Sequence, residues 1–268
     1  MIDESIDIGT TEKKRFGISG AVLKMIAVIS MFVDHFAAVY LFQEYEAFVN
    51  NSKPVPGFIR DMIADGSIAY VHNISRLVGR IAFPIYCFLM IEGFKYTRDK
   101  AKYCIRLFVF AFISQIPFGL AFANRIFDPE YVNVFFTLAI GFVTVWIVDT
   151  IKQRMVGRER EANLISVVLI LAFAALAEFM NTDYGALGII LIALMYISRY
   201  DRISCSISAI AVLLGYSLVL DHESELYAIF AFIPIWLYNG EKGRQWKYFF
   251  YWFYPVHLMA LWALWTFT

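Results

Sequence analysis

Long runs of apolar residues, broken by short polar segments, recur along almost the whole chain. A helix needs about 20 predominantly apolar residues to cross a bilayer, and most of these runs approach that length. We interpret nine runs as candidate membrane spans, at roughly residues 19–43, 77–94, 105–123, 131–151, 162–180, 184–198, 204–220, 225–239 and 247–267. The pattern predicts an all-α fold, a polytopic integral membrane helix bundle, with residues 1–18 as a cytoplasmic tail and 19–268 as one transmembrane domain.

The connecting segments are short, except for the one between the first two spans. That segment runs from about Glu44 to Ser75 and contains a predicted short interfacial helix at Phe58–Ala64. Two runs, Gly185–Ile197 and Leu226–Tyr238, are shorter than a perpendicular span, which indicates helices that lie partly inside the protein. Most Lys and Arg residues lie before the first span and on alternate loops. The positive-inside rule therefore places the N-terminus in the cytoplasm and, with nine spans, the C-terminus outside.

The composition agrees with a membrane protein. Of the 268 residues, 60% are hydrophobic, whereas a soluble domain is about 45–50% apolar. The formal net charge is zero and no basic stripe is interleaved with aromatic residues, which argues against a nucleic-acid partner. The three cysteines are isolated along the chain and fit neither a disulfide framework nor a zinc site, so we expect no metal.

The first span carries Lys24, Asp34 and His35 within or at the edge of its apolar run. Ionisable side chains inside a bilayer cost at least about 2.5–3.5 kcal/mol each, so they are functional candidates, although a structural hydrogen-bonding role is the alternative. Lys24 and His35 are eleven residues apart, which places them within about 20° of one helix face and about 16 Å apart along the axis. Histidine is suited to accept and return a proton near neutral pH. Asp34 is a candidate to orient its ring.

Other ionisable side chains mark later spans. Arg76 and Arg80 lie four residues apart at the outer end of the second span, where they would bind a phosphate, a carboxylate or lipid headgroups, or extend toward water. Glu92 lies toward the inner end of the same span, and Arg98 belongs to the basic cluster that follows it. That cluster fits either an anionic cytoplasmic ligand or plain topological charge. His257 in the last span is a second intramembrane histidine, and spacing alone does not say whether it meets the first.

Six blocks of sequence carry a family resemblance: LKMIAVISMFVDHFAAVY, GRIAFPIYCFLMIEGFKYTRDKAKYCIRLFVFAFISQIPFGLAF, NVFFTLAIGF, DYGALGIILI, YNGEKG and KYFFYWFYPVHLMALW. In this order they resemble the TraX family, integral membrane proteins named for pilin N-acetylation. That family is similar in turn to the acyltransferase-3 group and the wider transmembrane acyl-transferase superfamily. The resemblance covers nearly the whole chain from about residue 20 and implies a bacterial cytoplasmic membrane.

The resemblance also implies roles for particular residues. The acyltransferase-3 group has a basic residue, ten spacers and a histidine, which correspond here to Lys24 through His35. In that group the histidine acts as the catalytic base and acetyl-CoA enters from the cytoplasm. The segment FLMIEGF matches the second-helix signature of the group, but Glu92 stands where those proteins usually have serine. The chain also has one predicted span fewer than the ten usual in that group.

These observations predict a membrane-embedded acetyl- or acyltransferase. The donor would be acetyl-CoA or another acyl-CoA, and the acceptor an unidentified amine or hydroxyl of an envelope protein, glycan or lipid. The candidate catalytic residues are His35, Asp34 and His257. The candidate cofactor-binding residues are Lys24, Arg80, Glu92 and Arg98. The alternative from another class is a proton-coupled small-molecule transporter, which needs intramembrane ionisable groups too, and a third is an envelope-assembly scaffold without chemistry.

Overall fold

The computed structural model describes residues 16–126, 130–220, 223–244 and 246–268, so most of the predicted tail lies outside the described residues. Within these ranges the chain is helical and forms no strand. The helices are α1 (Gly20–His35), η1 (Phe36–Leu41), α2 (Phe42–Val49), α3 (Gly57–Ala64), α4 (Ser67–Gly79), α5 (Ala82–Tyr96), α6 (Lys100–Ala123), α7 (Val134–Arg154), α8 (Glu159–Phe179), α9 (Gly185–Ile197), α10 (Arg202–Leu220), η2 (Glu223–Ala231), α11 (Phe232–Trp236) and α12 (Lys247–Phe267). The predicted all-α class is confirmed.

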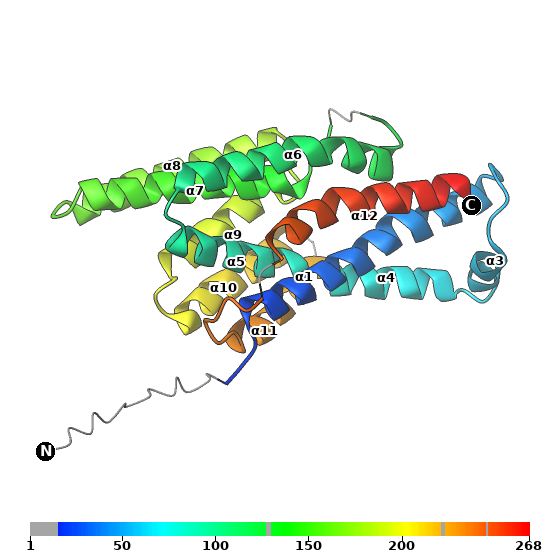
Figure 1. The fold of residues 1–268 in the computed structure, drawn as a ribbon, viewed down its shortest axis with the longest axis horizontal. Coiled ribbons are helices and arrows are strands. Elements are labelled where there is room, and N and C mark those ends of the chain that lie inside the picture. Colours follow the sequence, from blue (N-terminus) through cyan, green and yellow to red (C-terminus); the bar gives the residue numbers. More distant parts are fainter. Residues whose placement is uncertain (1–15, 127–129, 221–222, 245) are drawn as a thin grey trace, which may run out of the picture.

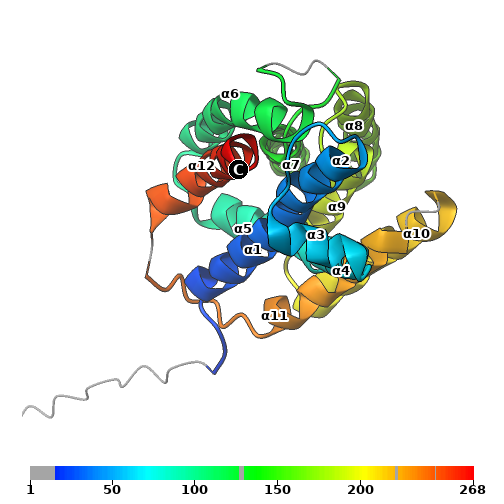
Figure 2. The same ribbon diagram turned by 90° about the vertical axis from the view of Figure 1, so that its right-hand side faces the viewer.

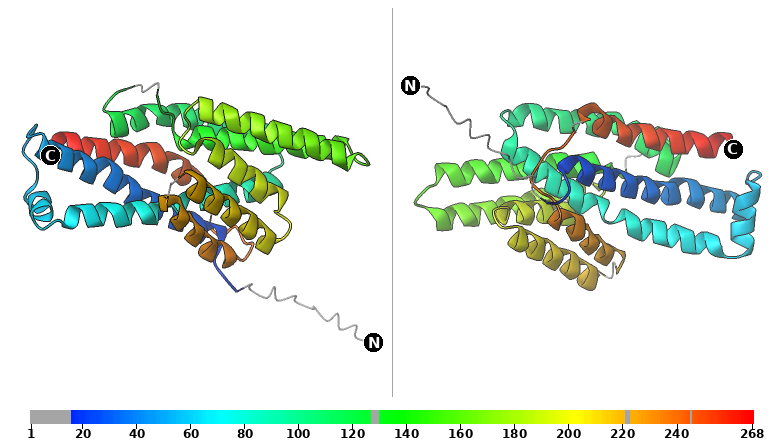
Figure 3. Two further views of the ribbon diagram at one scale, coloured as in Figure 1. Left: turned by 180° about the vertical axis from the view of Figure 1, so that it is seen from behind. Right: turned by 60° about the horizontal axis from the view of Figure 1, so that its bottom comes forward.

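Most of the long helices run roughly along one axis, whereas α3 lies across it, as Figure 1 shows. Helices α6, α7 and α8 lie side by side on one side of the bundle, and α12 packs between α6 and α1. Figure 2 looks along the bundle and shows α5 near the centre of the bundle. Helix α5 contacts α1, α7 and α9. The two views of Figure 3 show α10 and α11 on the side opposite α6. This order brings the first and last long helices of the chain together.

Six helical stretches of the described chain are long and apolar enough to cross a membrane. They are Gly20–Val49, Ser67–Tyr96, Lys100–Ala123, Val134–Arg154, Glu159–Phe179 and Arg202–Val219. Two shorter apolar helices, Gly185–Ile197 and Ser224–Trp236, occupy the places of the two short spans predicted from the sequence. Helix α12 has 21 residues, and at about 1.5 Å per residue that length also suits a bilayer. The protein is therefore a multi-pass membrane protein, and the count of nine spans stays a prediction.

The first long helix is continuous through α1, η1 and α2. Ser19 caps its start, and its side chain accepts the N–H of Val22. The π-helical turn η1 begins at Phe36, directly after His35. A π-helical turn inserted in an α-helix is uncommon and frequently marks a functional site, because it changes the direction of the side chains that follow. The interruption here adjoins the histidine that the sequence singles out.

The expected long loop between the first two spans is shorter than predicted. Helix α3 (Gly57–Ala64) confirms the predicted short helix, but α4 already begins at Ser67, so the boundary near residue 77 is wrong. Residues 67–76 mix apolar and polar side chains and belong to a helix that packs against α1, so they form a helix without forming a long apolar run. Helices α4 and α5 join at Arg80 and Ile81, whose N–H groups donate to carbonyls only three residues earlier.

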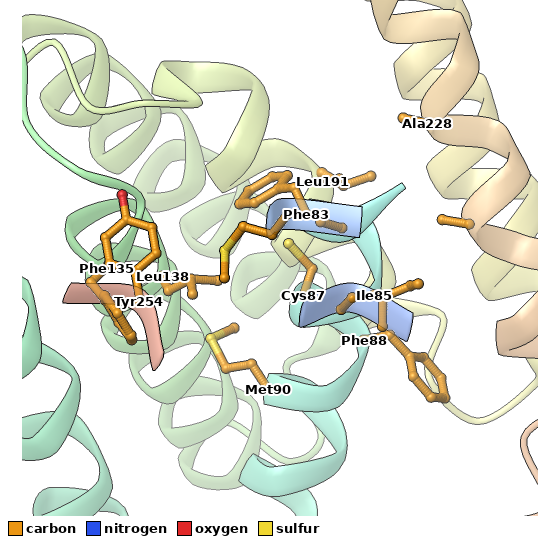
Figure 4. Packing of buried hydrophobic residues seen from close by; sticks show 14 of the residues in the cluster. Phe83, Ile85, Cys87, Phe88, Met90, Phe135, Leu138, Leu191, Ala228 and Tyr254 are labelled. Carbon is orange, nitrogen blue, oxygen red and sulfur yellow. The ribbon is translucent and has the colours of Figure 1, made fainter. Parts of the chain in front are cut away.

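Helix α5 forms the central wall of the core. Its side chains Phe83, Cys87 and Met90 are buried and lie near Phe135 and Leu138 of α7 and Tyr254 of α12, as Figure 4 shows. Buried apolar contacts of this kind hold helices together in a membrane through close packing rather than through release of water. The three cysteines of the chain, Cys87 among them, are free thiols.

Candidate active site

Two histidines from opposite ends of the chain meet inside the bundle. His35 is the last residue of α1 and His257 lies in the middle of α12. The Nδ1 atom of His35 lies 2.6 Å from Nε2 of His257, a hydrogen bond between residues 222 positions apart. Both side chains are buried, with exposed fractions of 8% and 5%. We call this pair the histidine dyad.

The hydrogen bonds of the histidine dyad assign its protons. Nδ1 of His257 lies 2.7 Å from the carbonyl oxygen of Phe253, one helical turn earlier. Since a carbonyl oxygen only accepts, Nδ1 of His257 carries the proton and its Nε2 is an acceptor. Nδ1 of His35 therefore donates to that Nε2, which leaves a lone pair on Nε2 of His35. The dyad thus presents one free basic nitrogen.

Aromatic rings fix the orientation of both imidazoles. Phe253 stacks on His257 at a centroid distance of 4.7 Å, and Phe122 packs edge-on against His35 at 5.6 Å. The ring of Tyr254 contacts both histidines, at 5.8 Å and 5.7 Å. Such close packing restricts the rotation of the imidazole rings. The lone pair on His35 is therefore held in one direction.

Two ion pairs lie beside the histidine dyad. Arg76 donates from Nη1 to Oδ2 of Asp34 at 2.6 Å, and Arg80 pairs with Glu225 at 3.0 Å. The same Asp34 oxygen lies 3.9 Å from Nε2 of His35, close enough to attract an imidazolium but too far for a hydrogen bond in the present geometry. Arg76 thus holds the Asp34 carboxylate where it would attract His35 once the imidazole is protonated.

A glycine makes room for that carboxylate. A Cβ atom added to Gly79 would lie 2.2 Å from Oδ1 of Asp34, a distance that no real contact tolerates. Gly79 ends α4, one residue before Arg80. The absence of a side chain here lets α4 approach α1 closely enough for Arg76 to reach Asp34.

Four cavities follow one another along the bundle. The basic cavity, of about 330 Å³, is bordered by Lys24, Glu92, Arg106 and Lys242. The apolar cavity, of about 220 Å³, shares Lys24, Leu89, Gly93 and Tyr103 with it. The histidine cavity, of about 240 Å³, contains His35 and shares Met31, Tyr86, Val134 and Tyr254 with the apolar cavity. The acidic cavity, of about 180 Å³, shares Arg80, Tyr131, Asp183 and Tyr184 with the histidine cavity. Adjacent cavities therefore have common walls, from the basic cavity through the apolar and histidine cavities to the acidic cavity.

The basic cavity has a cationic rim supported by aromatic rings. The Lys24 ammonium lies 5.3 Å from the ring centre of Phe250, and Arg106 lies at the same distance from the ring centre of Tyr103. Backbone hydrogen bonds from Gly20 and Ala21 fix the loop that carries Lys242 to the start of α1. Cations gathered in this way attract phosphate groups.

The acidic cavity, which adjoins the histidine cavity, is bordered by Glu178, Asp183 and Glu225. Asp183 lies in the loop between α8 and α9. Its N–H donates to the carbonyl oxygen of Val132, which lies just before α7. Burial of the carboxyl group, and next the charge of Asp34, raise the pKa of Asp183 to about 6. Arg80 opposes this effect without cancelling it. Three carboxyl groups and the Arg80 guanidinium thus border this cavity.

The structure brings some of the candidate residues together and separates others. His35, Asp34 and His257 meet, with Asp34 turned toward Arg76. Lys24 and Glu92 both border the basic cavity. Two candidates for donor binding lie elsewhere. Arg80 borders the histidine and acidic cavities at the far end, and Arg98 is exposed and borders none of the four cavities.

Sequence reasoning missed several residues that border the cavities, chiefly Tyr254, Arg106 and Lys242. Lys242 and Arg106 belong to the basic residues of the alternate loops, which indicate orientation and were given no role in binding. Tyr254 is one of 16 tyrosines, and no local pattern separates it from the others. Among the described residues, no group of three or more His, Cys, Asp or Glu side chains is arranged to hold a metal ion.

Comparison with known proteins gives a consistent result. The sequence model of the TraX protein family matches residues 19–265. A probable fimbrial assembly protein, FimC of serogroup H1 from Dichelobacter nodosus, is 29% identical over 229 residues, which cover 82% of this chain and 77% of that protein. No solved structure matches the fold.

Proposed function

This chain belongs to the TraX family, and we propose that it is a membrane-embedded acyltransferase. It would move an acetyl or other acyl group from cytoplasmic acyl-CoA to an amine or hydroxyl acceptor at the outer face. One observation carries the proposal: His35, whose Nδ1 is engaged by His257, borders a cavity that adjoins an apolar cavity, which in turn adjoins a cationic one. A donor and an acceptor can thus reach one base from opposite ends.

The donor side is the basic cavity together with the apolar cavity. The loop charges predict that this end of α1 faces the cytoplasm, where acyl-CoA is available. Lys24, Arg106 and Lys242 would bind the phosphates of the donor. The pantetheine arm equals about five extended residues, on the order of 17 Å, and Lys24 and His35 are about 16 Å apart along α1. The arm is therefore long enough to deliver a thioester to the histidine dyad.

The chemistry begins with proton transfer from the acceptor. Nε2 of His35 takes the proton of the amine or hydroxyl while the acceptor atom bonds to the thioester carbon, and the carbonyl electrons move to its oxygen. When this intermediate collapses, the C–S bond breaks and the CoA sulfur leaves with the proton that His35 returns. The imidazolium formed in between is stabilised by its hydrogen bond to His257 and by the Asp34 carboxylate.

The acceptor side is the histidine cavity together with the acidic cavity. Arg76 and Arg80 border the histidine cavity from the end that the loop charges place outside. We therefore assign Arg80 to acceptor binding rather than to the donor. The relative from Dichelobacter nodosus is named as a fimbrial assembly protein, which supports an acceptor among the subunits of a pilus or fimbria.

A proton-coupled transporter is the competing proposal, because adjoining cavities that contain ionisable groups suit transport as well. The two differ in the fate of a thioester. Only an acyltransferase consumes acetyl-CoA, and only a transporter moves a solute without covalent change.

The test is transfer of label from [¹⁴C]acetyl-CoA by the purified protein in lipid nanodiscs to an envelope fraction from cells that lack the gene. The wild type should transfer label, and His35→Ala should lower the rate by at least about 100-fold, the usual contribution of a general base. His72→Ala, a change of a half-buried histidine on α4, serves as the matched control and should retain activity. A wild-type protein that neither transfers label nor consumes acetyl-CoA would rule the proposal out and favour transport.

A further inference from the structure

The acyl transfer proposed above develops negative charge on the thioester oxygen, and the cationic groups near the site are poorly placed to receive it. Lys24 borders the basic and apolar cavities but not the histidine cavity. Arg76 and Arg80 border the histidine cavity but not the apolar cavity, and they pair with Asp34 and Glu225 respectively. Nε2 of His257 accepts the proton of His35 and cannot donate. A different donor is needed where the apolar and histidine cavities meet.

The hydroxyl group of Tyr254 lies at that junction. Tyr254 borders both cavities, and its side chain is only 2% exposed. Among the described residues its hydroxyl oxygen has no hydrogen-bond partner. A buried polar atom without a partner is unfavourable and rare in folded proteins, so its presence here needs an explanation. A ligand atom that completes the hydrogen bond would supply one.

The start of α7 provides a second donor beside this hydroxyl. The cap residue Asn133 accepts the N–H of Phe135 through its side chain and that of Phe136 through its carbonyl. Val134, the first residue of α7, borders both the apolar and the histidine cavities, as Tyr254 does. It belongs to the first turn, where peptide N–H groups have no partner within the helix and the helix dipole favours negative charge.

The surroundings hold both donors in place. Gln115 of α6 hydrogen-bonds the N–H and the side chain of Asn133, at 3.1 Å and 2.8 Å, and this fixes the first turn of α7. The ring of Phe135 packs edge-on against Tyr254 at 5.3 Å. Figure 4 shows the phenol oxygen of Tyr254 directed toward the Phe83 end of α5 and away from Met90. Phe83 borders the histidine cavity and Met90 borders the apolar cavity, so the hydroxyl points toward the histidine side of the junction.

We propose that the hydroxyl of Tyr254 and the N–H of Val134 form the oxyanion site of the acyl transfer, with Tyr254 as a catalytic residue that donates to the thioester oxygen. This inference rests on the proposed function. As the acceptor attacks, the carbonyl π electrons move to oxygen and both donors hydrogen-bond the resulting anion; Tyr254 keeps its proton. When the electrons return and the C–S bond breaks, His35 supplies the proton to the leaving sulfur. Donors that are fixed in advance stabilise the transition state more than the ground state.

The test uses Tyr254→Phe, which removes one oxygen and keeps the ring. With hydroxylamine as a small acceptor, acetohydroxamate formed from acetyl-CoA gives the rate, and a titration of acetyl-CoA in the absence of acceptor gives its Kd. Removal of one oxyanion donor should lower kcat by about 100- to 1,000-fold and leave this Kd within twofold. Tyr248→Phe removes a hydroxyl from an exposed position of the same helix and should change neither quantity.

The outcomes separate this inference from the proposed function. If the wild type forms product and His35→Ala does not, but Tyr254→Phe keeps the wild-type kcat, the oxyanion site is wrong and the acyltransferase stands. A loss of activity in Tyr86→Phe but not in Tyr254→Phe would also overturn it, because Tyr86 borders the same two cavities. If the wild type forms no product, both proposals fail. Should Tyr254→Phe not fold, 3,5-difluorotyrosine at position 254 keeps the donor, and activity should persist; its loss would count against the inference.

Discussion

The role of His257 can be tested by two replacements that separate packing from hydrogen bonding. His257→Phe keeps an aromatic ring in a buried position and removes the atom that accepts the proton of His35. His257→Gln loses the ring but retains an amide oxygen that can accept the same hydrogen bond. If His257 fixes the tautomer of His35, the Phe variant should lose more activity than the Gln variant.

The size of the loss follows from the geometry of the histidine dyad. The present bond joins Nδ1 of His35 to Nε2 of His257 over 2.6 Å in a buried site. A buried donor left without an acceptor costs about 1–3 kcal/mol. His35 can avoid this cost by moving its proton to Nε2, where the Asp34 carboxylate lies 3.9 Å away. The proton then occupies the nitrogen that must act as the base. A preference of 1–3 kcal/mol for the inactive tautomer corresponds to a rate about 5- to 150-fold lower.

The measurement is kcat for acetohydroxamate formation, with the melting temperature in detergent as a check on folding. His257→Phe should fold and fall within that range, and His257→Gln should recover part of the lost rate. A folded His257→Phe protein with activity within twofold of the wild type would refute the tautomer argument. So would a Gln variant that is no better than the Phe variant, since the acceptor atom would then be irrelevant.

Three further changes test the surroundings of the site. Gly79→Ala would place a methyl group against the Asp34 carboxylate, so the rate of acyl transfer should fall by at least about tenfold. The control is Gly215→Ala in α10, which has open space around the glycine and should leave the rate unchanged. Lys53→Ala removes the partner of Glu44, which is 0% exposed, and should destabilise the protein by on the order of 3 kcal/mol; an unchanged melting temperature would contradict this. Asp183 binds its proton more tightly in the folded protein, with a pKa of about 6, so its contribution to stability is present at acid pH and is lost as the pH rises toward and through 6. Asp183→Asn should remove this part of the pH dependence of the melting temperature, and identical wild-type and variant profiles would refute it.

Much of the helical architecture could be predicted from the sequence, because a bilayer requires long apolar helices and leaves few alternatives. The prediction failed where a helix is not apolar. Helix α4 begins at Ser67 because its amphipathic sequence packs against α1, and a search for apolar runs misses such a segment. The segment expected at 225–239 is a 3₁₀ stretch followed by the short helix α11, which contains Pro234, rather than one α-helix.

The candidate site was only partly predictable. His35 stood out because a charged or titratable residue in an apolar run is costly. Its meeting with His257 depends on how α1 packs against α12, and no local spacing encodes a contact over 222 residues. Tyr254 could not be identified from the sequence for a related reason. Its significance lies in a buried hydroxyl that has no hydrogen-bond partner within the described parts of the chain, which only the three-dimensional structure reveals.

The distribution of charge explains how such a site can exist inside a membrane. Near the histidine dyad, Arg76 is neutralised by Asp34 and Arg80 by Glu225. In the tautomers assigned above, His35 and His257 are both neutral, so the resting site carries no net charge from these groups. Under the proposed mechanism, charge develops only when donor and acceptor are both present, as an imidazolium and an oxyanion that form together and vanish together. Each of the two charges is stabilised by a group already in place. Because they form together, no isolated charge arises in the low-dielectric interior, where its free energy would be high.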